Sequence, residues 1–400
     1  MAGQLTKQLI GKEDLSIQYN TNDPEQFSRL NSVGGTINLY QIPDVWTGTG
    51  KINVGKIEIE GHILPLPATY TVFKSGSTYY AISGTDSLPN YSNTNFVDLM
   101  DAVMLVVGCN GTSYKQGNKV IIREGWYALT KSWDIPPTQD FELDAGTCGF
   151  GYTPVTGAAI LIDSFMNCRF KFGMVIASNG TNEAVVNMKP RTVGPDSLTI
   201  GIVSDFIFDG IVNASKTNTA LMLDASFGSI NSNRISINEI ADSLCGIEAV
   251  INAPSLGEIV DNHFFLSAHN VTNGIKVGAS GANSISRNMF YATLKGDGTG
   301  VGLDIYNDSS IYHVSCYGFN ANQDIILRVS ADNNLFIGQF PDGFTDSSAT
   351  TTNKIIDQNQ GLYLPGIPIY VNNAGALAGG LKAGQFYRLN ADPDHLCIVH

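Results

Sequence analysis

Charged side chains recur at one position of a repeated apolar segment and are the first candidates for chemistry. Glu248, Lys276, Asp304 and Arg328 each lie inside a short run: Gly-Ile-Glu-Ala, Gly-Ile-Lys-Val, Gly-Leu-Asp-Ile and Ile-Leu-Arg-Val. If these runs are successive strands of one sheet, the backbones of Glu248 and Asp304 lie about 10 Å apart. Inverting glycosidases hold their two carboxyl groups about 6.5–9.5 Å apart. Glu248 and Asp304 are therefore candidates for a catalytic pair.

A charge ladder is the alternative interpretation of these four residues, and it is favoured. Lys276 would lie between the two carboxylates and keep both ionised, whereas a general acid must hold a proton. Neighbouring strands would pair Glu248 with Lys276 and Asp304 with Arg328. Exposed pairs of this kind contribute less than about 1 kcal/mol each. The sequence thus leaves enzymatic activity open but favours a non-catalytic protein; the enzyme class would be glycoside hydrolase or polysaccharide lyase.

A second set of residues forms a mostly aromatic stripe that is expected to point outward. Its members follow an inward apolar position in successive repeats: Phe208, Ser236, Phe265, Tyr291, Tyr317 and Ile337. Such a stripe is unusual on a solvated surface. It could stack on sugar rings or form a subunit interface, and we favour the interface. Two alternatives stay open: a loop covers the stripe, or the inward and outward positions are shifted by one residue.

Other reactive residue types lack the spacing that chemistry requires. His263, beside Asn262, is expected to be a surface residue. The Gly-rich segment 296–302 has no helix after it and is expected to be a turn rather than a nucleotide loop. The six cysteines show no metal spacing and are expected to be buried free thiols. No metal and no cofactor is predicted. The cysteines are Cys109, Cys148, Cys168, Cys245, Cys316 and Cys397.

The segments that must position these residues repeat along the chain. Five similar segments begin at residues 230, 259, 285, 311 and 331, and weaker copies begin at 165 and 202. A second series, beginning at 220, 246, 274, 302 and 326, lies between them. Two strand registers that repeat together every 20–29 residues are typical of stacked coils. The sequence therefore predicts an all-β protein built on a right-handed, single-stranded parallel β-helix.

Stacked coils place like residues in columns along the axis, about 4.8 Å apart. One inward column is expected to contain Ile207, Ile235, Phe264, Phe290 and Phe336. A ladder of side-chain amides, hydrogen bonded along the axis, is expected at a turn. Its members are Asn233, Asn262, Asn288 and Asn334.

Three regions are expected along the chain. Residues 1–90 form an N-terminal β-rich module, which contains a strand within 51–60 and a hairpin around Lys74–Ser77. Residues 91–350 form the β-helix, which begins with a capping helix over 95–108 whose N-cap is Asn95. Residues 351–400 form a small C-terminal β module.

Composition agrees with this fold and excludes several classes of protein. Glycine accounts for 42 of the 400 residues and asparagine for 35, and the net charge is −13. The hydrophobic share of 43% is too high for disorder, and the acidic balance disfavours nucleic-acid binding. The first twenty residues lack the apolar core of a signal peptide. The apolar run 102–107 is too short for a membrane span.

The opening of the β-helix resembles that of pectate-lyase-like domains, which occur in bacteriophage tailspikes and polysaccharide-acting enzymes. The resemblance rests on the helix at 95–108, on Lys119–Tyr127 and on Trp133–Pro136. Residues 376–399 are similar to a short tail module of phage structural proteins. No catalytic signature of pectate lyases is recognisable.

The resemblance implies a structural virion protein of a phage tail, of tail-fibre or tailspike type, that is used in host attachment. It also implies a homotrimer that is made in the host cytoplasm and joins other virion proteins through residues 1–90. A host surface polysaccharide would be its ligand. The alternatives are a polysaccharide depolymerase on the same scaffold and a purely architectural head or tail component.

Overall fold

The computed structural model describes most of the chain between residues 69 and 399. Side chains are described for residues 69–84, 88–107, 118–178, 183–191, 200–251, 257–278, 285–320, 323–348, 352–358 and 370–383, and for Tyr387, Cys397 and Val399. Backbone strands alone are described at β1 (Leu5–Leu9), β2 (Leu15–Tyr19), β3 (Ile57–Ile59), β4 (His62–Leu64) and β34 (Gly361–Tyr363).

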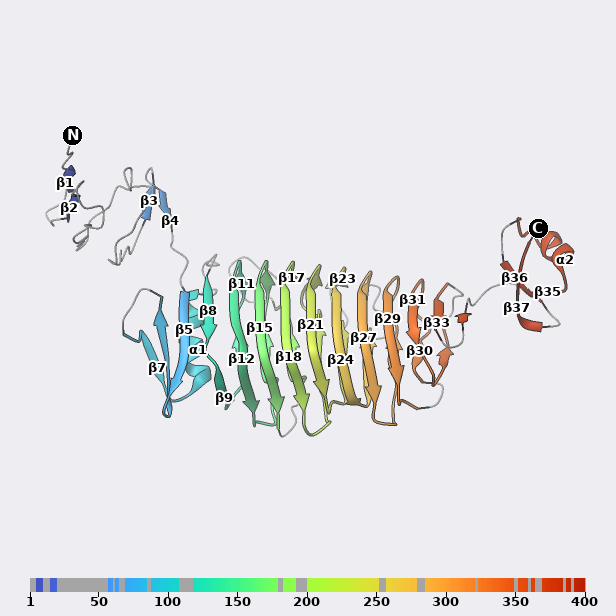
Figure 1. Ribbon diagram of the computed structural model, residues 1–400, viewed down its shortest axis with the longest axis horizontal. Coiled ribbons are helices and arrows are strands. Elements are labelled where there is room, and N and C mark those ends of the chain that lie inside the picture. The colour runs from blue at the N-terminus through green and yellow to red at the C-terminus, as the bar shows by residue number, and fades with distance from the viewer. Residues whose placement is uncertain are drawn as a thin grey trace.

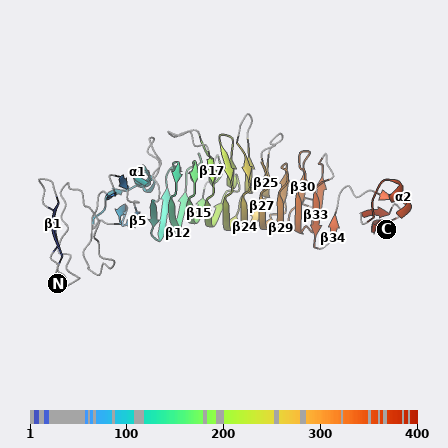
Figure 2. The same cartoon turned by 90° about the horizontal axis from the view of Figure 1, so that it is seen from above.

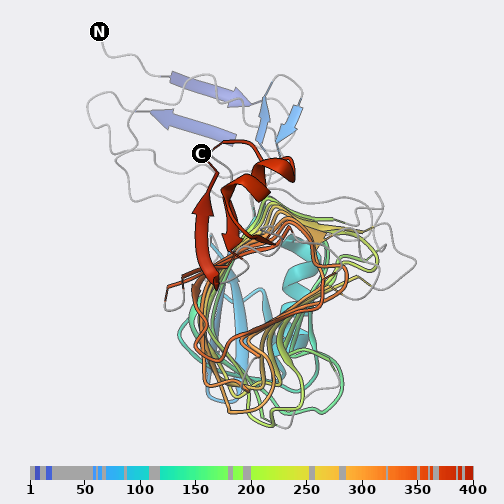
Figure 3. The same ribbon diagram turned by 90° about the vertical axis from the view of Figure 1, so that its right-hand side faces the viewer.

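The described chain winds into a parallel β-helix of about 8 turns, so the predicted fold is confirmed. The coils lie side by side in Figure 1 and superpose when seen along the axis in Figure 3. Three sheets run the length of this solenoid, and each coil contributes one strand to each sheet in its central part. Equivalent strands of successive coils pair in parallel register, as with Phe264 and Phe290.

The strands of the largest sheet are β12 (Glu142–Tyr152), β15 (Arg169–Ala177), β18 (Asp205–Asn213), β21 (Arg234–Ala241), β24 (His263–Val271), β27 (Met289–Gly296), β29 (Ile311–Tyr317), β31 (Leu335–Gln339) and β33 (Lys354–Asp357). A second sheet contains β10 (Trp133–Ile135), β13 (Ile160–Ile162), β16 (Val186–Met188), β19 (Thr219–Asp224), β22 (Cys245–Val250), β25 (Asn273–Val277), β28 (Leu303–Ile305), β30 (Ile325–Leu327) and β32 (Phe344–Asp346). A third sheet contains β11 (Thr138–Gln139), β14 (Phe165–Met166), β17 (Ile200–Ile202), β20 (Ser229–Asn231), β23 (Ile259–Val260) and β26 (Ile285–Ser286).

Alternation along the long strands places one apolar column inside the solenoid. Phe264 and Phe290 stack with ring centroids 4.4 Å apart, and Tyr312 and Phe336 continue the stack at 4.9 and 4.8 Å. Ile235 lies in this column, as predicted, but Ile207 does not. Phe206 is the inward residue and pairs with Ile235, whereas Ile207 is half-buried on the other face. The predicted alignment of that coil was wrong by one residue.

A helix covers the N-terminal end of the solenoid. α1 (Phe96–Val107) begins after Asn95, whose Oδ1 accepts hydrogen bonds from the N–H groups of Val97 and Asp98. Its apolar face is buried, and Phe96 packs edge-on against Trp133 of the first coil. The predicted capping helix is confirmed; Gly108 lies outside the described residues.

The predicted hairpin belongs to the solenoid's largest sheet. β5 (Thr69–Ser75) pairs antiparallel with β6 (Thr78–Ser83), which pairs with β7 (Tyr91–Asn93). β5 also pairs in parallel with β8 (Lys119–Ile122), and β9 (Gly125–Leu129) pairs with β12. The sheet therefore begins before the predicted boundary at residue 90. The expected strand within 51–60 is described only over β3.

The C-terminal boundary is shifted in the same way. β33 pairs in parallel with β31, so the solenoid's sheet continues past residue 351. Beyond it, β35 (Ile369–Tyr370), β36 (Phe386–Leu389) and β37 (Asp392–Ile398) form a separate sheet beside α2 (Asn373–Ala378). This small unit has its own buried cluster of Ala376, Tyr387 and Val399. Figure 2 shows it beyond the last coil.

Candidate functional site

A ladder of buried amides joins the coils at the turn between the third sheet and the largest sheet. Asn233, Asn262 and Asn288 lie in this turn, and each is at most 2% exposed. The backbone N–H of Asn233 donates to Asn262 Oδ1 at 3.0 Å, and that of Asn262 donates to Asn288 Oδ1 at 3.0 Å. The amide of Asn262 donates back to the Ile230 carbonyl at 2.8 Å. Each side chain thus ties its coil to the preceding one.

Residues that the sequence reasoning missed complete the ladder. Ser310 lies between Asn288 and Asn334: its Oγ accepts from the N–H of Asn288 at 3.1 Å, and its N–H donates to Asn334 Oδ1 at 3.0 Å. Ser204 and Asn353 extend the column at its two ends. The signal that could have found them is a small polar residue just before each long strand.

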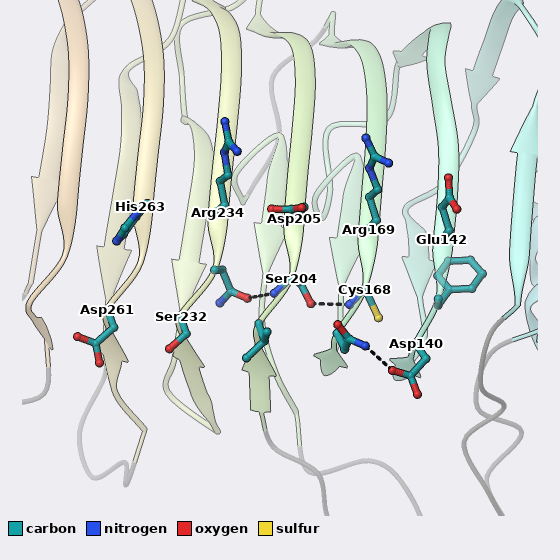
Figure 4. Close-up of a pocket in the computed structure, with 14 residues that line it drawn as sticks. Asp140, Glu142, Cys168, Arg169, Ser204, Asp205, Ser232, Arg234, Asp261 and His263 are labelled. Carbon is teal, nitrogen blue, oxygen red and sulfur yellow. Dashed lines mark hydrogen bonds between the residues drawn. The ribbon is translucent and has the colours of Figure 1, made fainter.

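The same turn borders a groove of about 710 Å³ that crosses successive coils. The groove is lined by the first residues of the long strands and by the turn residues before them, as Figure 4 shows. The strand residues carry alternating charge across β12, β15, β18 and β21, and β24 adds a histidine. They are Glu142, Arg169, Asp205, Arg234 and His263.

Three of these charged groups stand without an ion-pair partner. In the described part of the chain, no opposite charge lies within 4 Å of the side chains of Arg169, Asp205 or Arg234, whereas Lys119 lies 2.8 Å from Glu142. Figure 4 shows Asp205 between the two arginines, whose side chains extend in the same direction. Two strand spacings place the backbones of Arg169 and Arg234 about 10 Å apart. The sheet therefore holds exposed hydrogen-bonding groups of both signs at fixed intervals.

The remaining acids of the groove are occupied by neighbours. Arg287 forms a bidentate ion pair with Asp261, with two hydrogen bonds of 2.9 Å from its guanidinium to the carboxylate oxygens. These hydrogen bonds lower the pKa of the Asp261 carboxyl. Asp140 accepts a hydrogen bond from the amide of Asn167 at 2.7 Å. His263, expected to be a surface residue, is exposed in the groove.

Glu248 and Asp304 lie on the outward face of the second sheet, separated by Lys276. Lys276 Nζ is 2.8 Å from Glu248 Oε1, and Arg328 makes two hydrogen bonds to Asp304 at 2.6 and 3.1 Å. Ile326 is the residue in register with Asp304. Arg328 follows it by two residues in the chain, and its side chain extends back to Asp304. Both carboxylates are thus held in ion pairs, which is the arrangement of a charge ladder.

The aromatic stripe differs from the predicted set at two positions. Phe265, Tyr291 and His313 stack on the outward face with centroids 5.1 Å apart, and Ile337 follows them. Phe208 is fully buried and stacks inside on Phe172, because that coil was misaligned by one residue. Tyr317 is 42% exposed but pairs with Lys295 near the other end of its strand.

The predictions of Phe208 and Tyr317 as members of the stripe were therefore wrong. For Tyr317, the cause is that the coil from Asn288 to Ser310 is shorter than expected. The predicted alignment of this coil with the preceding one was therefore wrong by four residues. His313 takes the place that the sequence alignment assigned to Tyr317. The outward apolar surface continues on the neighbouring column through Met289, Ile311 and Leu335, all half-buried.

The described residues show no metal-binding cluster and no membrane-spanning helix. Among them, no group of three or more histidine, cysteine or acidic side chains could hold a metal ion. Cys148, Cys168, Cys245 and Cys316 are buried free thiols, and Cys397 is half-buried; Cys109 lies outside the described part. No described helix is both long and apolar enough to pass through a membrane. Comparisons with protein-family models, curated proteins and solved structures found no match to this chain.

Proposed function

We propose that this chain is a structural virion protein of a bacteriophage tail, of tail-fibre or tailspike type, that binds a host surface polysaccharide in the groove beside the amide ladder. The observation that carries the proposal is the row of exposed charged groups without ion-pair partners at Arg169, Asp205 and Arg234. The guanidinium of Arg234 also lies over the Phe265 ring, 5.2 Å from its centroid. Guanidinium groups donate hydrogen bonds to sugar oxygens, and a carboxylate accepts them from hydroxyls. A rigid row of such groups across several coils suits a polymer that lies along the axis.

The shape of the groove supports a polymer over a small ligand. Sites for small molecules are enclosed and mostly apolar, with few polar groups. This groove is instead open to solvent, runs across the starts of the long strands, and presents polar groups from five coils. The buried ladder below it fixes the spacing of those groups, so the binding surface is preorganised.

An array of purified bacterial capsular and O-antigen polysaccharides tests this binding. We expect the intact protein to bind at least one polysaccharide, and the double variant Arg169→Ala/Arg234→Ala to bind it at least tenfold more weakly. Lys354→Ala is the matched control, because Lys354 is an exposed cation in the same column outside the groove. Equal binding by the double variant, or no binding to any polysaccharide on the array, would overturn the proposal.

The virion assignment rests on the resemblance of the chain to phage proteins and on its long solenoid with a small C-terminal unit. Under this proposal residues 1–90 attach the protein to other tail proteins, and the apolar outward face around Tyr291 joins three copies. Antibody labelling of phage particles, viewed by electron microscopy, checks the location. Labels at the distal tail support an adhesin, whereas labels confined to the head or tail tube indicate an architectural component.

A depolymerase is the second candidate, favoured by one observation. Glu142 and Asp205 line the same groove two coils apart, which resembles the spacing of an inverting pair. Against it, Lys119 keeps Glu142 ion-paired, and a general acid must hold a proton. Release of reducing ends from a bound polysaccharide, abolished by Asp205→Asn, would establish the enzyme. The same assay with Glu248→Gln and Asp304→Asn tests the pair suggested by the sequence.

A further inference from the structure

Trp126 occupies an unusual position on the outward face of the solenoid. It lies in β9, which pairs with the C-terminal half of β12, and 54% of its surface is exposed. Its register partner on β12 is Gly149, and Gly151, two residues further along the same strand, pairs with Ala128. A Cβ atom added at Gly149 would overlap the indole at Cε3, and one added at Gly151 would lie 2.7 Å from Cζ2. The indole therefore lies flat across these two glycines.

Polar groups lie on the neighbouring stretch of β12 and β15, a few residues before the two glycines. Met174, one coil further along, pairs with Gly149, and its side chain lies over Gly210 of the following coil rather than beside the indole. On the strand of Met174, the side chain of Lys171 lies along Gly146, where an added Cβ would be 2.8 Å from its Nζ. No carboxylate of the described chain lies within 4 Å of that ammonium group, and Thr147 beside it is exposed. One ring face is thus backed by main chain and the other faces solvent.

We propose that Trp126 and Lys171 form a saccharide-binding subsite that takes one pyranose ring of a polysaccharide. The C–H face of the sugar stacks on the indole, and Lys171 donates a hydrogen bond to a hydroxyl or carboxylate oxygen. The size of the platform favours this ligand over a protein partner. An aromatic side chain buries about 150–250 Å², whereas a specific protein interface needs about 800 Å² from each partner.

The indole of this subsite lies away from the groove, because Gly149 lies seven residues after Glu142 along β12, which corresponds to roughly 20 Å. Lys171 is the member of the subsite nearer the groove, two residues after Arg169 on β15. Loss of the groove arginines therefore leaves the indole in place, and loss of the indole leaves the arginines in place. The two sites are distinguished by their variants: Arg169→Ala/Arg234→Ala for the groove and Trp126→Ala for the platform.

Saturation-transfer NMR of the full chain with methyl β-D-glucopyranoside and methyl β-D-galactopyranoside tests the proposal. We expect transfer to the C–H protons of one ring face and at least a fivefold loss of this signal in Trp126→Ala. Phe227→Ala is the matched control, since Phe227 is an aromatic residue with 55% exposure elsewhere on the surface. No transfer from either sugar, or an unchanged signal in Trp126→Ala, would overturn the proposal.

A second variant tests whether binding requires the flat orientation of the indole, rather than only the presence of an aromatic ring. The three atoms nearest to a Cβ at Gly149 all belong to Trp126, so Gly149→Ala must lift the indole while it keeps the ring. We expect Gly149→Ala to weaken the signal severalfold and Trp126→Phe to retain part of it. A signal in Gly149→Ala equal to that of the unmodified protein would contradict a platform. Thermal unfolding of each variant verifies that the fold is kept.

Discussion

Asp324, the residue before β30, is a buried acid near the C-terminal end of the solenoid. Its Oδ2 accepts a hydrogen bond from the backbone N–H of Asp342 at 2.7 Å, and its Oδ1 has no partner in the described chain. Burial, followed by the charges of Asp342 and Asp357, raises the pKa of the Asp324 carboxyl to about 6. The buried thiol of Cys316 also lies within its electrostatic reach. The last coils therefore carry a carboxyl group that holds its proton to a higher pH in the folded protein than in the unfolded chain.

This shift predicts a pH-dependent stability. The unfolded carboxyl loses its proton near pH 3.9, whereas the folded one keeps it up to about pH 6. The contribution of Asp324 to stability is thus fully present below pH 4 and is lost as the pH rises to about 6. We expect Asp324→Asn to raise the melting temperature more at pH 7 than at pH 4.

Thermal scans of the protein and the variant at several pH values provide the measurement. The difference between the two curves isolates Asp324 from the other acids. Asp209→Asn serves as the control, since Asp209 is exposed on the largest sheet. A difference curve that is flat between pH 4 and pH 7 would show that this carboxyl titrates normally.

At the scale of the element, the turn before each long strand holds the coils together through the amide ladder. Asn262 accepts two hydrogen bonds from Asn233 and donates to Ile230, Val260 and Asn288. Alanine would leave the buried N–H of Asn233 without an acceptor, and each such group costs about 1–3 kcal/mol. We expect Asn262→Ala to destabilise the central coils by about 2–4 kcal/mol.

Amide hydrogen exchange of β21 and β24 measures this effect locally, because a solenoid opens coil by coil. Exchange should become at least tenfold faster in Asn262→Ala. Asn262→Ser should lose less, because Ser204 and Ser310 serve as acceptors at equivalent positions. Asn238→Ala, a change of an exposed residue on β21, is the control. If serine were as damaging as alanine, the oxygen acceptor would not be the stabilising feature.

The repeated turn also explains how much the sequence could predict. Asn233, Asn262 and Asn288 precede their strands by the same offset, so sequence reasoning located the ladder and the inward column in the central coils. Where serine replaces asparagine, at Ser204 and Ser310, the marker of the turn is lost and the alignment slips. That slip misplaced Phe208 and Tyr317.

The groove and the Trp126 platform could not be predicted from the sequence, for a different reason. Arg169 and Asp205 come together only through the pairing of β15 with β18 across a coil of unusual length. The platform depends on the space above Gly149 and Gly151, which no periodic pattern reports. Sequence periodicity predicts which residues share a column, whereas side-chain orientation between columns requires coordinates.

At the scale of the whole molecule, the outward face of the largest sheet changes character along the axis. Its first coils carry Glu142, Arg169, Asp205 and Arg234, and the equivalent positions in later coils are Met289, Ile311 and Leu335. The stack of Phe265, Tyr291 and His313 runs beside the apolar positions. A contiguous apolar surface of this kind on a rigid sheet is typical of a subunit interface. The proposed division is therefore a polysaccharide-binding half and an assembly half.

Replacement of Tyr291 by lysine tests the assembly half. Tyr291 lies at the centre of the stack, and a lysine there would place a charge in the proposed trimer interface, where central aromatic residues contribute 2 kcal/mol or more. We expect light scattering to give a trimeric mass for the unmodified protein and a monomeric mass for Tyr291→Lys at micromolar concentration, with at least a 30-fold weaker association. Met222→Lys, an equivalent change on the outward face of β19, should stay trimeric. A trimer in Tyr291→Lys would place the interface elsewhere on the molecule. A monomer in the unmodified protein would contradict the proposed trimer.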